Sequence, residues 1–328
     1  MSNISPTLQA FFTQRLPQRN ASSHTVAAYR DTFKLLLSYM QDLTGIAPHD
    51  LDFEQLTPER IGSFLDYLES DRHVSSSTRN ARLAAIHSFF RFAGLRHPEH
   101  LQTIQRIMDI QSKRTGKPVV SFLTTEEVEA LLAVPNLRRW TGRRDQVLLL
   151  LTVQTGLRVS EVTSLRIKDV HLDFGPHVDV VGKGRKHRST PLTADVAAAL
   201  RLWLRERLGT PGDPLFPNPR GLSLTRDAIR HALSHYVNVA SKECPSLAHK
   251  KVGPHTLRHT AAMRLLEAGV DTSVIALWLG HESPRTTHVY LHAHLALKER
   301  ALARTAPINT VPGRYQPSDH LLAFLEAL

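Results

Sequence analysis

The first 110 residues contain helix-forming segments separated by turn signals, and this pattern constrains the fold more than any other feature of the sequence. Four segments open on a capping residue or a proline and repeat apolar residues at helical spacing: 22–45, 57–70, 75–94 and 98–110. No alternating pattern typical of a strand interrupts them. The sequence therefore predicts a compact helical domain over residues 1–110.

The remaining residues predict a second domain that is also mainly helical. Residues 111–121 are polar, basic and broken by glycine and proline, which is typical of a linker. β-Branched runs on both sides of a Gly-Lys-Gly-Arg turn predict a hairpin at 177–192. The second domain is expected over 122–306, followed by a tail, 307–328, with a short apolar helix. The predicted fold class is mainly α with a small antiparallel β-sheet.

The charge of the chain indicates a polyanionic partner. The 328 residues include 41 Lys and Arg against 30 Asp and Glu, a net charge of +11. Residues 1–110 are balanced, so the whole excess lies in 111–328. Five arginines and no acidic residue occur between Asp71 and Glu99. Nucleic acid is the commonest partner of such a chain, and solubility is the alternative explanation.

Other features of the composition predict a cytoplasmic protein. No apolar run approaches the roughly 20 residues that a membrane span requires. The N-terminal residues lack the pattern of a secretion signal. The single cysteine, Cys244, excludes an intrachain disulfide and suits a reducing compartment.

Six polar residues far apart in the chain stand out, although each alone has an ordinary structural explanation. Arg158 in "TGLRVSE" could pair with Glu161, and Lys183 lies in a predicted turn. His255 and Arg258 of "HTLRH" are three residues apart and would share one face of a helix. The set comprises Arg158, Lys183, His255, Arg258, His281 and Tyr290.

Together, these residue types suit one reaction. Arginines donate bidentate hydrogen bonds to the non-bridging oxygens of a phosphodiester, which gain charge in the transition state. Histidines donate to those oxygens or transfer protons near neutral pH. A lysine can protonate the leaving oxygen, and a tyrosine can attack phosphorus. Because cationic side chains supply the positive charge, the reaction needs no metal.

The residues resemble the tyrosine recombinases, the family of phage integrases and Xer-type recombinases. The resemblance covers about 20–305 and is carried by "TGLRVSEV", "VGKGRKHRSTPL", "HTLRHTAAMRLLEAGVDTSVIALWLGH" and "TTHVY". The order Arg, Lys, His-x-x-Arg, His, Tyr is the catalytic order of the family, and His281 precedes Tyr290 by nine residues. The resemblance implies a two-domain DNA clamp, with a SAM-like core-binding domain at 1–110 and a catalytic domain at 122–306.

The resemblance also implies a role for each residue. Tyr290 would form a 3′-phosphotyrosyl bond, and a second duplex would reverse the attack through a Holliday junction. Arg158 and Arg258 would balance the phosphate charge, Lys183 would be the general acid, and His255 would be a general base or acid.

Further expectations concern the remaining polar residues and the partners. His281 would be an additional phosphate donor, His259 is structural, and Glu161 orients Arg158 or supports the fold. Double-stranded DNA is the expected partner of a homotetramer on paired sites, acting alone or with related recombinases and without a membrane. Expected DNA contacts are Arg79, Arg82, Arg91, Arg185 and Lys186.

Several alternatives stay open at this point. The residues in and around the motifs favour integration, excision or transposition of a mobile element over Xer-type chromosome or plasmid dimer resolution. A non-catalytic DNA-binding protein, a topoisomerase and a telomere resolvase are further alternatives. A zinc hydrolase is disfavoured, because Thr256 stands where its helix would need glutamate. The apolar stripe of the tail, 321–328, would dock on a neighbouring protomer or pack on its own domain.

Overall fold

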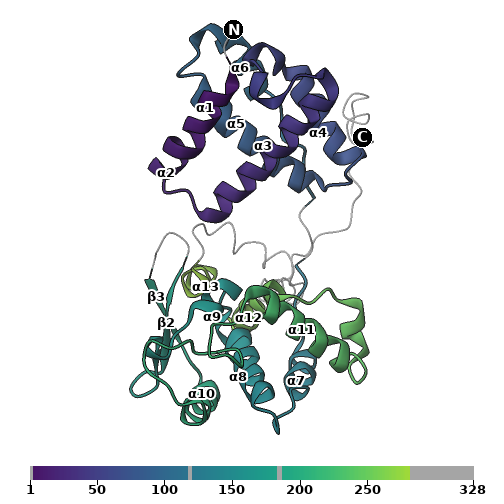
Figure 1. Ribbon diagram of the computed structural model, residues 1–328. Coiled ribbons are helices and arrows are strands. Elements are labelled where there is room, and N and C mark those ends of the chain that lie inside the picture. Colours follow the sequence, from purple (N-terminus) through teal and green to yellow (C-terminus); the bar gives the residue numbers. More distant parts are fainter. Residues whose placement is uncertain (1–2, 117–119, 183–186, 281–328) are drawn as a thin grey trace, which may run out of the picture. The chain divides into compact units, whose positions relative to one another are not determined.

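The computed structural model describes residues 3–116, 120–182 and 187–280. The chain divides into two compact units, Met1–Pro118 and Val119–Leu328 (Figure 1). Both units are mainly helical, and a small antiparallel sheet belongs to the second, so the predicted fold class is confirmed.

The N-terminal unit is made of helices joined by short turns. Its first helix continues through a π-helical turn at Phe11–Arg15 into the second, and 3-10 turns at Pro48–Asp50, Phe53–Gln55 and Pro98–His100 join later helices. The α-helices are α1 (Ile4–Ala10), α2 (Leu16–Gln18), α3 (Ser23–Thr44), α4 (Pro58–Ser70), α5 (Ser76–Ala93) and α6 (Leu101–Met108).

Side-chain caps set the starts of the three longest of these helices. Ser22, Thr57 and Ser75 each accept a hydrogen bond from the backbone N–H three residues later, at 3.1, 3.3 and 3.3 Å. Each cap satisfies a donor that would otherwise lack an intrahelical partner. The three helices therefore begin within one residue of the predicted positions.

The core of the N-terminal unit is aromatic. Phe89 of α5 is fully buried, and the centroid of its ring lies 5.1 Å from that of Phe33, 5.7 Å from that of Phe11 and 6.2 Å from that of Phe53. Residues from four separate elements thus meet at one ring, and burial of each contributes roughly 1.5–3 kcal/mol. The first of these elements, the π-helical turn, is not among the predicted helices.

The second unit has helices around a small sheet. Its helices are α7 (Thr125–Ala133), α8 (Trp140–Thr155), α9 (Val159–Ser164), α10 (Ala194–Arg207), α11 (Arg226–Ala240), α12 (Pro254–Glu267) and α13 (Thr272–Leu279). Its strands are β1 (Val170–His171), β2 (His177–Val181) and β3 (His187–Pro191), and 3-10 turns lie at Ile167–Asp169 and Pro245–His249.

The sheet has the order β1-β2-β3, and both pairs are antiparallel. Val178 and Val180 of β2 are buried, whereas the residues that alternate with them face outward. Val180 is paired with Arg188 of β3. Because directly paired residues share a face, Arg188 points toward the interior of the unit. The predicted hairpin is present, whereas the two-residue strand β1 is not predicted by the sequence.

Helix α8 is central to the second unit, with α7, α10 and α12 packed on it (Figure 1). Its apolar residues are buried around most of its circumference. The helix ends at Gly156, which has a φ of 65°. A Cβ there would lie 2.6 Å from Leu279 Cδ2 and 3.0 Å from Ala261 Cβ. Glycine thus permits both the left-handed turn and the close approach of α12 and α13.

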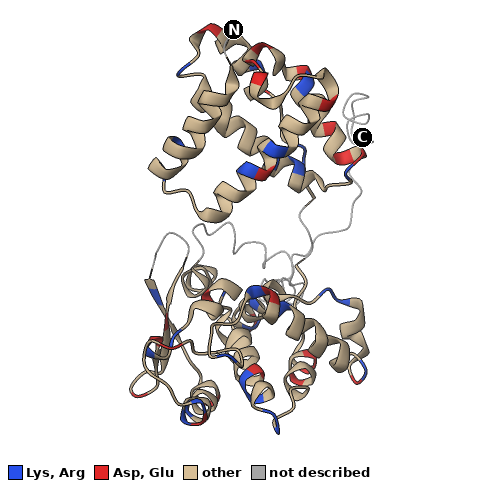
Figure 2. Cartoon of the chain, in the orientation of Figure 1, with Lys and Arg blue, Asp and Glu red and all other residues tan. Residues whose placement is uncertain are grey.

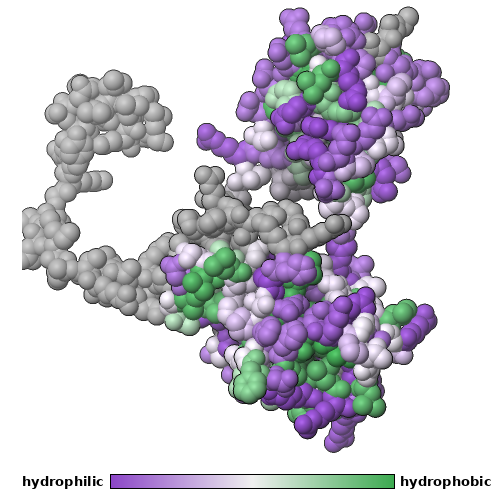
Figure 3. Space-filling model, turned by 90° about the vertical axis from the view of Figure 1, so that its left-hand side faces the viewer, coloured by the Kyte–Doolittle hydropathy of each residue, from purple (hydrophilic) through white to green (hydrophobic). Residues whose placement is uncertain are grey.

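The described surface is polar and mixed in charge. Basic and acidic residues occur together over the N-terminal unit (Figure 2). The face of that unit in Figure 3 is mostly hydrophilic, with small separate hydrophobic patches. Among the helices that the structure describes, none combines the length and apolar character that crossing a bilayer requires.

Candidate active site

Arg158 lies at the start of α9, two residues after the glycine that ends α8. Its backbone N–H donates to Glu161 Oε2 at 2.8 Å, and its guanidinium donates to Glu161 Oε1 at 3.1 Å. A second guanidinium nitrogen donates to the carbonyl of Gly280 at 3.1 Å. The side chain of Arg158 is 27% exposed, so part of it remains accessible to a ligand.

Helix α12 carries His255 and Arg258. Pro254 is its first residue, where the missing N–H costs no hydrogen bond, and Thr256 Oγ1 accepts from the N–H of Gly253 at 3.1 Å. His255 is exposed near this helix start, and Arg258 is buried one turn later. The helix therefore presents the imidazole outward and draws the guanidinium into the unit.

Arg258 connects the ends of two other helices. It donates to the carbonyl of Gly156, after α8, at 2.7 Å and to the carbonyl of Leu279, the last residue of α13, at 2.5 Å. Terminal carbonyls of a helix have no intrahelical partner and lie at the negative end of its dipole. A buried guanidinium in this position satisfies both carbonyls.

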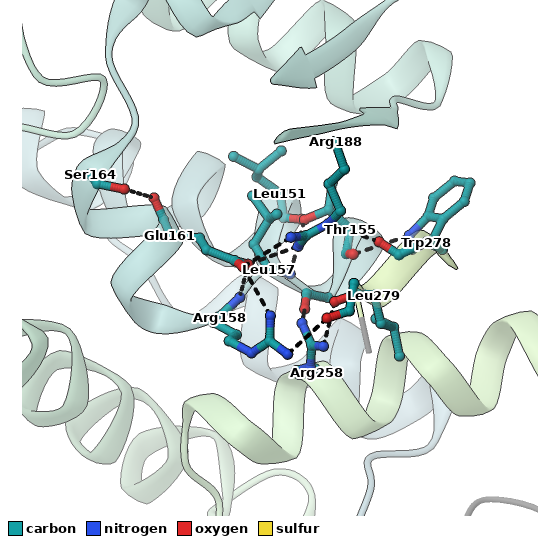
Figure 4. Close-up of polar contacts among 12 residues, drawn as sticks. Leu151, Thr155, Leu157, Arg158, Glu161, Ser164, Arg188, Arg258, Trp278 and Leu279 are labelled. Atoms are coloured by element: carbon teal, nitrogen blue, oxygen red, sulfur yellow. Dashed lines mark hydrogen bonds and ion pairs between the residues drawn. The ribbon is translucent and has the colours of Figure 1, made fainter. Parts of the chain in front are cut away.

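Three arginines therefore meet at the end of α13. Arg158 bonds the carbonyl of residue 280, Arg258 that of residue 279, and Arg188 of β3 donates from Nε to the carbonyl of Trp278 at 3.1 Å (Figure 4). The indole of Trp278 donates to the carbonyl of Thr155 at 3.1 Å, which joins α13 to the end of α8.

Glu161 is the buried counter-ion of this cluster. Only 3% of its side chain is exposed, and Arg188 binds it bidentately, at 3.0 Å to Oε1 and 2.8 Å to Oε2. Burial alone would raise the pKa of Glu161, but the hydrogen bonds and charges of Arg188 and Arg158 outweigh it and hold the pKa below its usual value. The expected pair between Glu161 and Arg158 is present.

Arg188 is the member of the cluster that the sequence analysis misses. The available signal is an arginine at a strand position that alternation assigns to the buried face. His259, interpreted as structural, is half-buried. Burial, with the nearby charges of His255 and Arg258, lowers its pKa.

The other predicted site residues lie outside the described ranges: Lys183, Arg185, Lys186, His281 and Tyr290. Lys183 belongs by sequence to the connection between β2 and β3. The C-terminal tail and its apolar stripe also lie outside the described residues.

The predicted DNA contacts of the N-terminal unit differ in exposure. Arg91 is exposed, Arg82 is half-buried and Arg79 is buried. Arg79 donates to the carbonyl of Gln111 at 3.1 Å, and its Nε lies 3.9 Å from Glu69 Oε2. In this structure Arg79 thus attaches the residues after α6 to α5, while a role of these arginines in DNA binding stays a prediction.

One group of side chains in the described part of the chain has the composition of a metal site. His171, His177 and Asp179 offer ligand atoms within 4.8 Å of one another. His171 Nε2 lies 3.0 Å from Asp179 Oδ2, in hydrogen-bond contact. The two imidazoles stack with centroids 4.6 Å apart and planes at 21°. Nearly parallel rings do not direct their lone pairs to one point, so this geometry is that of a His–Asp pair with a second ring stacked on it.

Known families and proteins match both units. Residues 121–296 match the model of the phage integrase family, and residues 8–97 match that of the phage integrase N-terminal SAM-like domain. A putative integrase/recombinase of Sinorhizobium fredii (strain NBRC 101917 / NGR234) is 48% identical over 100% of this chain and 99% of its own. The tyrosine recombinase XerD of Pseudomonas putida (strain KT2440) is 30% identical over 92% of this chain and 97% of its own.

A solved structure is similar as well. The pre-cleavage complex of the XerH site-specific recombinase bound to difH substrate has a TM-score of 0.66 and 25% identity, and the match covers 87% of this chain and 81% of XerH. The chain belongs to the phage integrase family. It is a tyrosine recombinase, an enzyme that cuts and rejoins DNA strands at specific sites, as the sequence motifs predict.

Proposed function

We propose that this recombinase acts on double-stranded DNA through a 3′-phosphotyrosyl intermediate formed by Tyr290. The observation that carries the proposal is the meeting of Arg158 and Arg258, 100 positions apart, at neighbouring carbonyls of the α13 end. Two guanidinium groups so placed supply bidentate donors for one phosphate. The exposed His255 lies one turn before Arg258 on the same helix, within the same region of the unit.

The proposed reaction proceeds in two balanced steps. The Tyr290 phenol attacks phosphorus, its proton passes to His255, and the bond from phosphorus to the 5′ oxygen breaks. Lys183 protonates the departing oxygen, and His281 donates to a non-bridging oxygen. In the second step a 5′-hydroxyl from another duplex attacks phosphorus and gives its proton to Lys183, the bond from phosphorus to Tyr290 breaks, and His255 returns its proton to the phenolate. The energy of the phosphodiester is kept, so no cofactor is consumed.

The proposal includes the assembly and the domain layout. Residues 1–110 form the core-binding domain, 122–306 the catalytic domain and 307–328 a tail. Four copies act on two paired sites, and the apolar stripe of the tail docks on a neighbouring copy. XerH has a similar fold and was solved in complex with its difH substrate. This similarity supports a DNA duplex as the ligand.

Trapping of covalent adducts tests the chemistry. Wild-type protein is incubated with DNA fragments that flank its gene, adducts are collected, and the attached ends are sequenced. The expected result is an adduct at the 3′ side of one defined junction, lost in Tyr290→Phe while duplex binding is retained. A wild-type protein that binds its site and yields no adduct would favour the alternative of a non-catalytic DNA-binding protein.

We further propose that the enzyme integrates, excises or transposes a mobile element. The relative named a putative integrase/recombinase is 48% identical over the whole chain, whereas XerD is 30% identical over 92% of it. The recovered junctions test this role. Junctions at both ends of a segment that includes the gene support it, whereas a single junction with no counterpart on the other side of the gene would favour dimer resolution.

A further inference from the structure

Arg188 links the strand that follows Lys183 to the two arginines proposed to bind the phosphate. It lies on β3 with its side chain 13% exposed, and each of its three guanidinium nitrogens has a protein acceptor. Two of those nitrogens bind the Glu161 carboxylate and Nε binds the carbonyl of Trp278. A guanidinium that binds a carboxylate through two nitrogens and a helix-end carbonyl through the third is suited to holding those groups in place.

The Glu161 carboxylate is shared by two guanidinium groups. Its Oε1 accepts from Arg158 at 3.1 Å and from Arg188 at 3.0 Å, and its Oε2 accepts from the Arg158 N–H and from Arg188, both at 2.8 Å. The direction in which Arg158 points is therefore set by the Glu161 carboxylate, which Arg188 holds from β3.

The same arginine holds the end of α13, where Arg158 and Arg258 bind neighbouring carbonyls. Gly280 leaves room for it: a Cβ at Gly280 would lie 2.9 Å from a terminal nitrogen of Arg188 and 3.2 Å from its Cζ. Since φ of Gly280 is 62°, this glycine also permits the left-handed turn that ends the helix.

Charge gives the arrangement a chemical consequence. Three guanidinium groups and one carboxylate give this cluster of described side chains a net charge of +2. Without Arg188, Glu161 would neutralise Arg158 and leave +1 to meet a phosphate whose negative charge grows in the transition state. Arg188 thus cancels the charge of Glu161 and leaves that of Arg158 available to the substrate.

We propose that Arg188 is a positioning residue for strand cleavage, which orients Arg158 and the α13 end through Glu161 and Trp278 and offsets the charge of the Glu161 carboxylate. The proposal rests on the proposed function, because it assumes that Arg158 and Arg258 bind the scissile phosphate. It assigns to Arg188 no contact with DNA.

The test separates binding from cleavage. The substrate is a nicked duplex built from the junction recovered by adduct trapping, at a concentration that saturates the protein. For Arg188→Met we expect adduct formation to slow by about 10²-fold, as for other small displacements of catalytic groups, while the affinity for the duplex changes by less than about threefold. Arg205→Met, an exposed arginine on α10, is the control for loss of one positive charge and should cleave at the wild-type rate.

A second substitution distinguishes charge balance from a merely structural role. Glu161→Gln combined with Arg188→Met returns the net charge of the cluster to +2 with nearly unchanged volume. We expect the double variant to form adduct at least about tenfold faster than Arg188→Met alone. A factor of ten is the size of effect that corresponds to an electrostatic interaction of one pKa unit. If the two substitutions slow adduct formation additively, the charge-balance argument is wrong.

Each remaining outcome is decisive. If Tyr290→Phe abolishes the adduct but Arg188→Met cleaves at the wild-type rate, the positioning role is wrong and the proposed function stands. If Tyr290→Phe still forms the adduct, the proposed function itself fails. Should Arg188→Met not fold, Arg188→Lys replaces it, because it keeps the charge but loses the bidentate geometry. Cleavage by Arg188→Lys at the wild-type rate would then reject the proposal.

Discussion

The two units of the chain bury different kinds of group. The N-terminal unit packs aromatic rings around Phe89, whereas the second unit buries Arg258 and Glu161 at the end of α13. Apolar contacts are non-directional, so a ring can shift without leaving a neighbour unsatisfied. A buried charge depends on each hydrogen bond that it makes. We therefore expect substitutions in the first core to change stability alone and those in the second cluster to change cleavage as well as stability.

The largest effect is expected from the most buried arginine of the site. Arg258→Met removes the donors to the carbonyls of Gly156 and Leu279 together with a proposed phosphate ligand. Loss of one such donor slows comparable reactions by about 10²–10³-fold. We expect the rate of adduct formation on the nicked duplex to fall to that extent, and gel-shift titration to show that binding of the duplex persists.

A substitution in the aromatic core is the matched control. Phe89→Leu should lower the stability of the N-terminal unit by roughly 1–3 kcal/mol, as measured by denaturant unfolding. At saturating DNA the same variant should form adduct at the wild-type rate. A comparable loss of cleavage in both variants would refute the division between a stabilising core and a reactive cluster.

Two glycines end helices, one in each unit, and replacing them with alanine should have intermediate effects on stability that differ between the units. Gly45 after α3 and Gly156 after α8 both have positive φ, 72° and 65°. No heavy atom lies within 4 Å of a Cβ built on Gly45, whereas one on Gly156 meets the buried Leu279 and Ala261. Gly45→Ala should cost about 1–2 kcal/mol for the backbone conformation alone. Gly156→Ala should cost about 1–3 kcal/mol more, because it also overpacks the core.

The same pair of variants also reports on the site. Overpacking at Gly156 displaces Leu279, whose carbonyl binds Arg258, so Gly156→Ala should slow adduct formation. Gly45→Ala should leave that rate unchanged. Equal stability losses in thermal unfolding, with no difference in cleavage, would show that the α13 end adapts without moving the guanidinium.

The aromatic unit was the more readily predicted from sequence, because helical periodicity and capping residues are local signals. Helices α3, α4 and α5 begin at the predicted places. The helices before them were missed. Pro6 and Pro17 interrupt the local pattern there, although both residues lie in helical turns of the structure. The helical periodicity of the apolar residues therefore locates most of this core but not its first element.

The charged cluster was predictable in residue type and not in its contacts. The motifs single out Arg158, His255 and Arg258, but the bond from Arg158 to Gly280 spans 122 positions. Arg188 was missed because its partner, Glu161, is 27 positions away on another element. Which carbonyl receives which guanidinium depends on how α8, α12 and α13 pack, and no local pattern encodes that packing.

The smallest expected effect is a difference in acid sensitivity between two carboxylates. The pKa of Glu161 is below its usual value, because bonds to Arg188 and Arg158 outweigh burial. A carboxylate whose pKa is lower in the folded state stabilises the fold above its unfolded pKa, near 4.5, and loses that contribution as the pH falls through the folded pKa. Glu161→Gln should therefore reduce stability at pH 7 and make its decline between pH 5 and pH 3 shallower.

Glu69 of the N-terminal unit provides the comparison for this prediction. Its pKa is also lowered, chiefly by the hydrogen bond from Lys113, but this ion pair is more accessible to water than that of Glu161, with 49% of the lysine and 20% of the glutamate side chain exposed. Surface pairs contribute little because water and salt screen them. Glu69→Gln should thus change the denaturant midpoint less than Glu161→Gln at pH 7, and added salt should reduce its effect further. An equal response of both variants to pH and salt would mean that burial does not strengthen the Glu161 pair, and the contrast between the two units would then rest on the arginines alone.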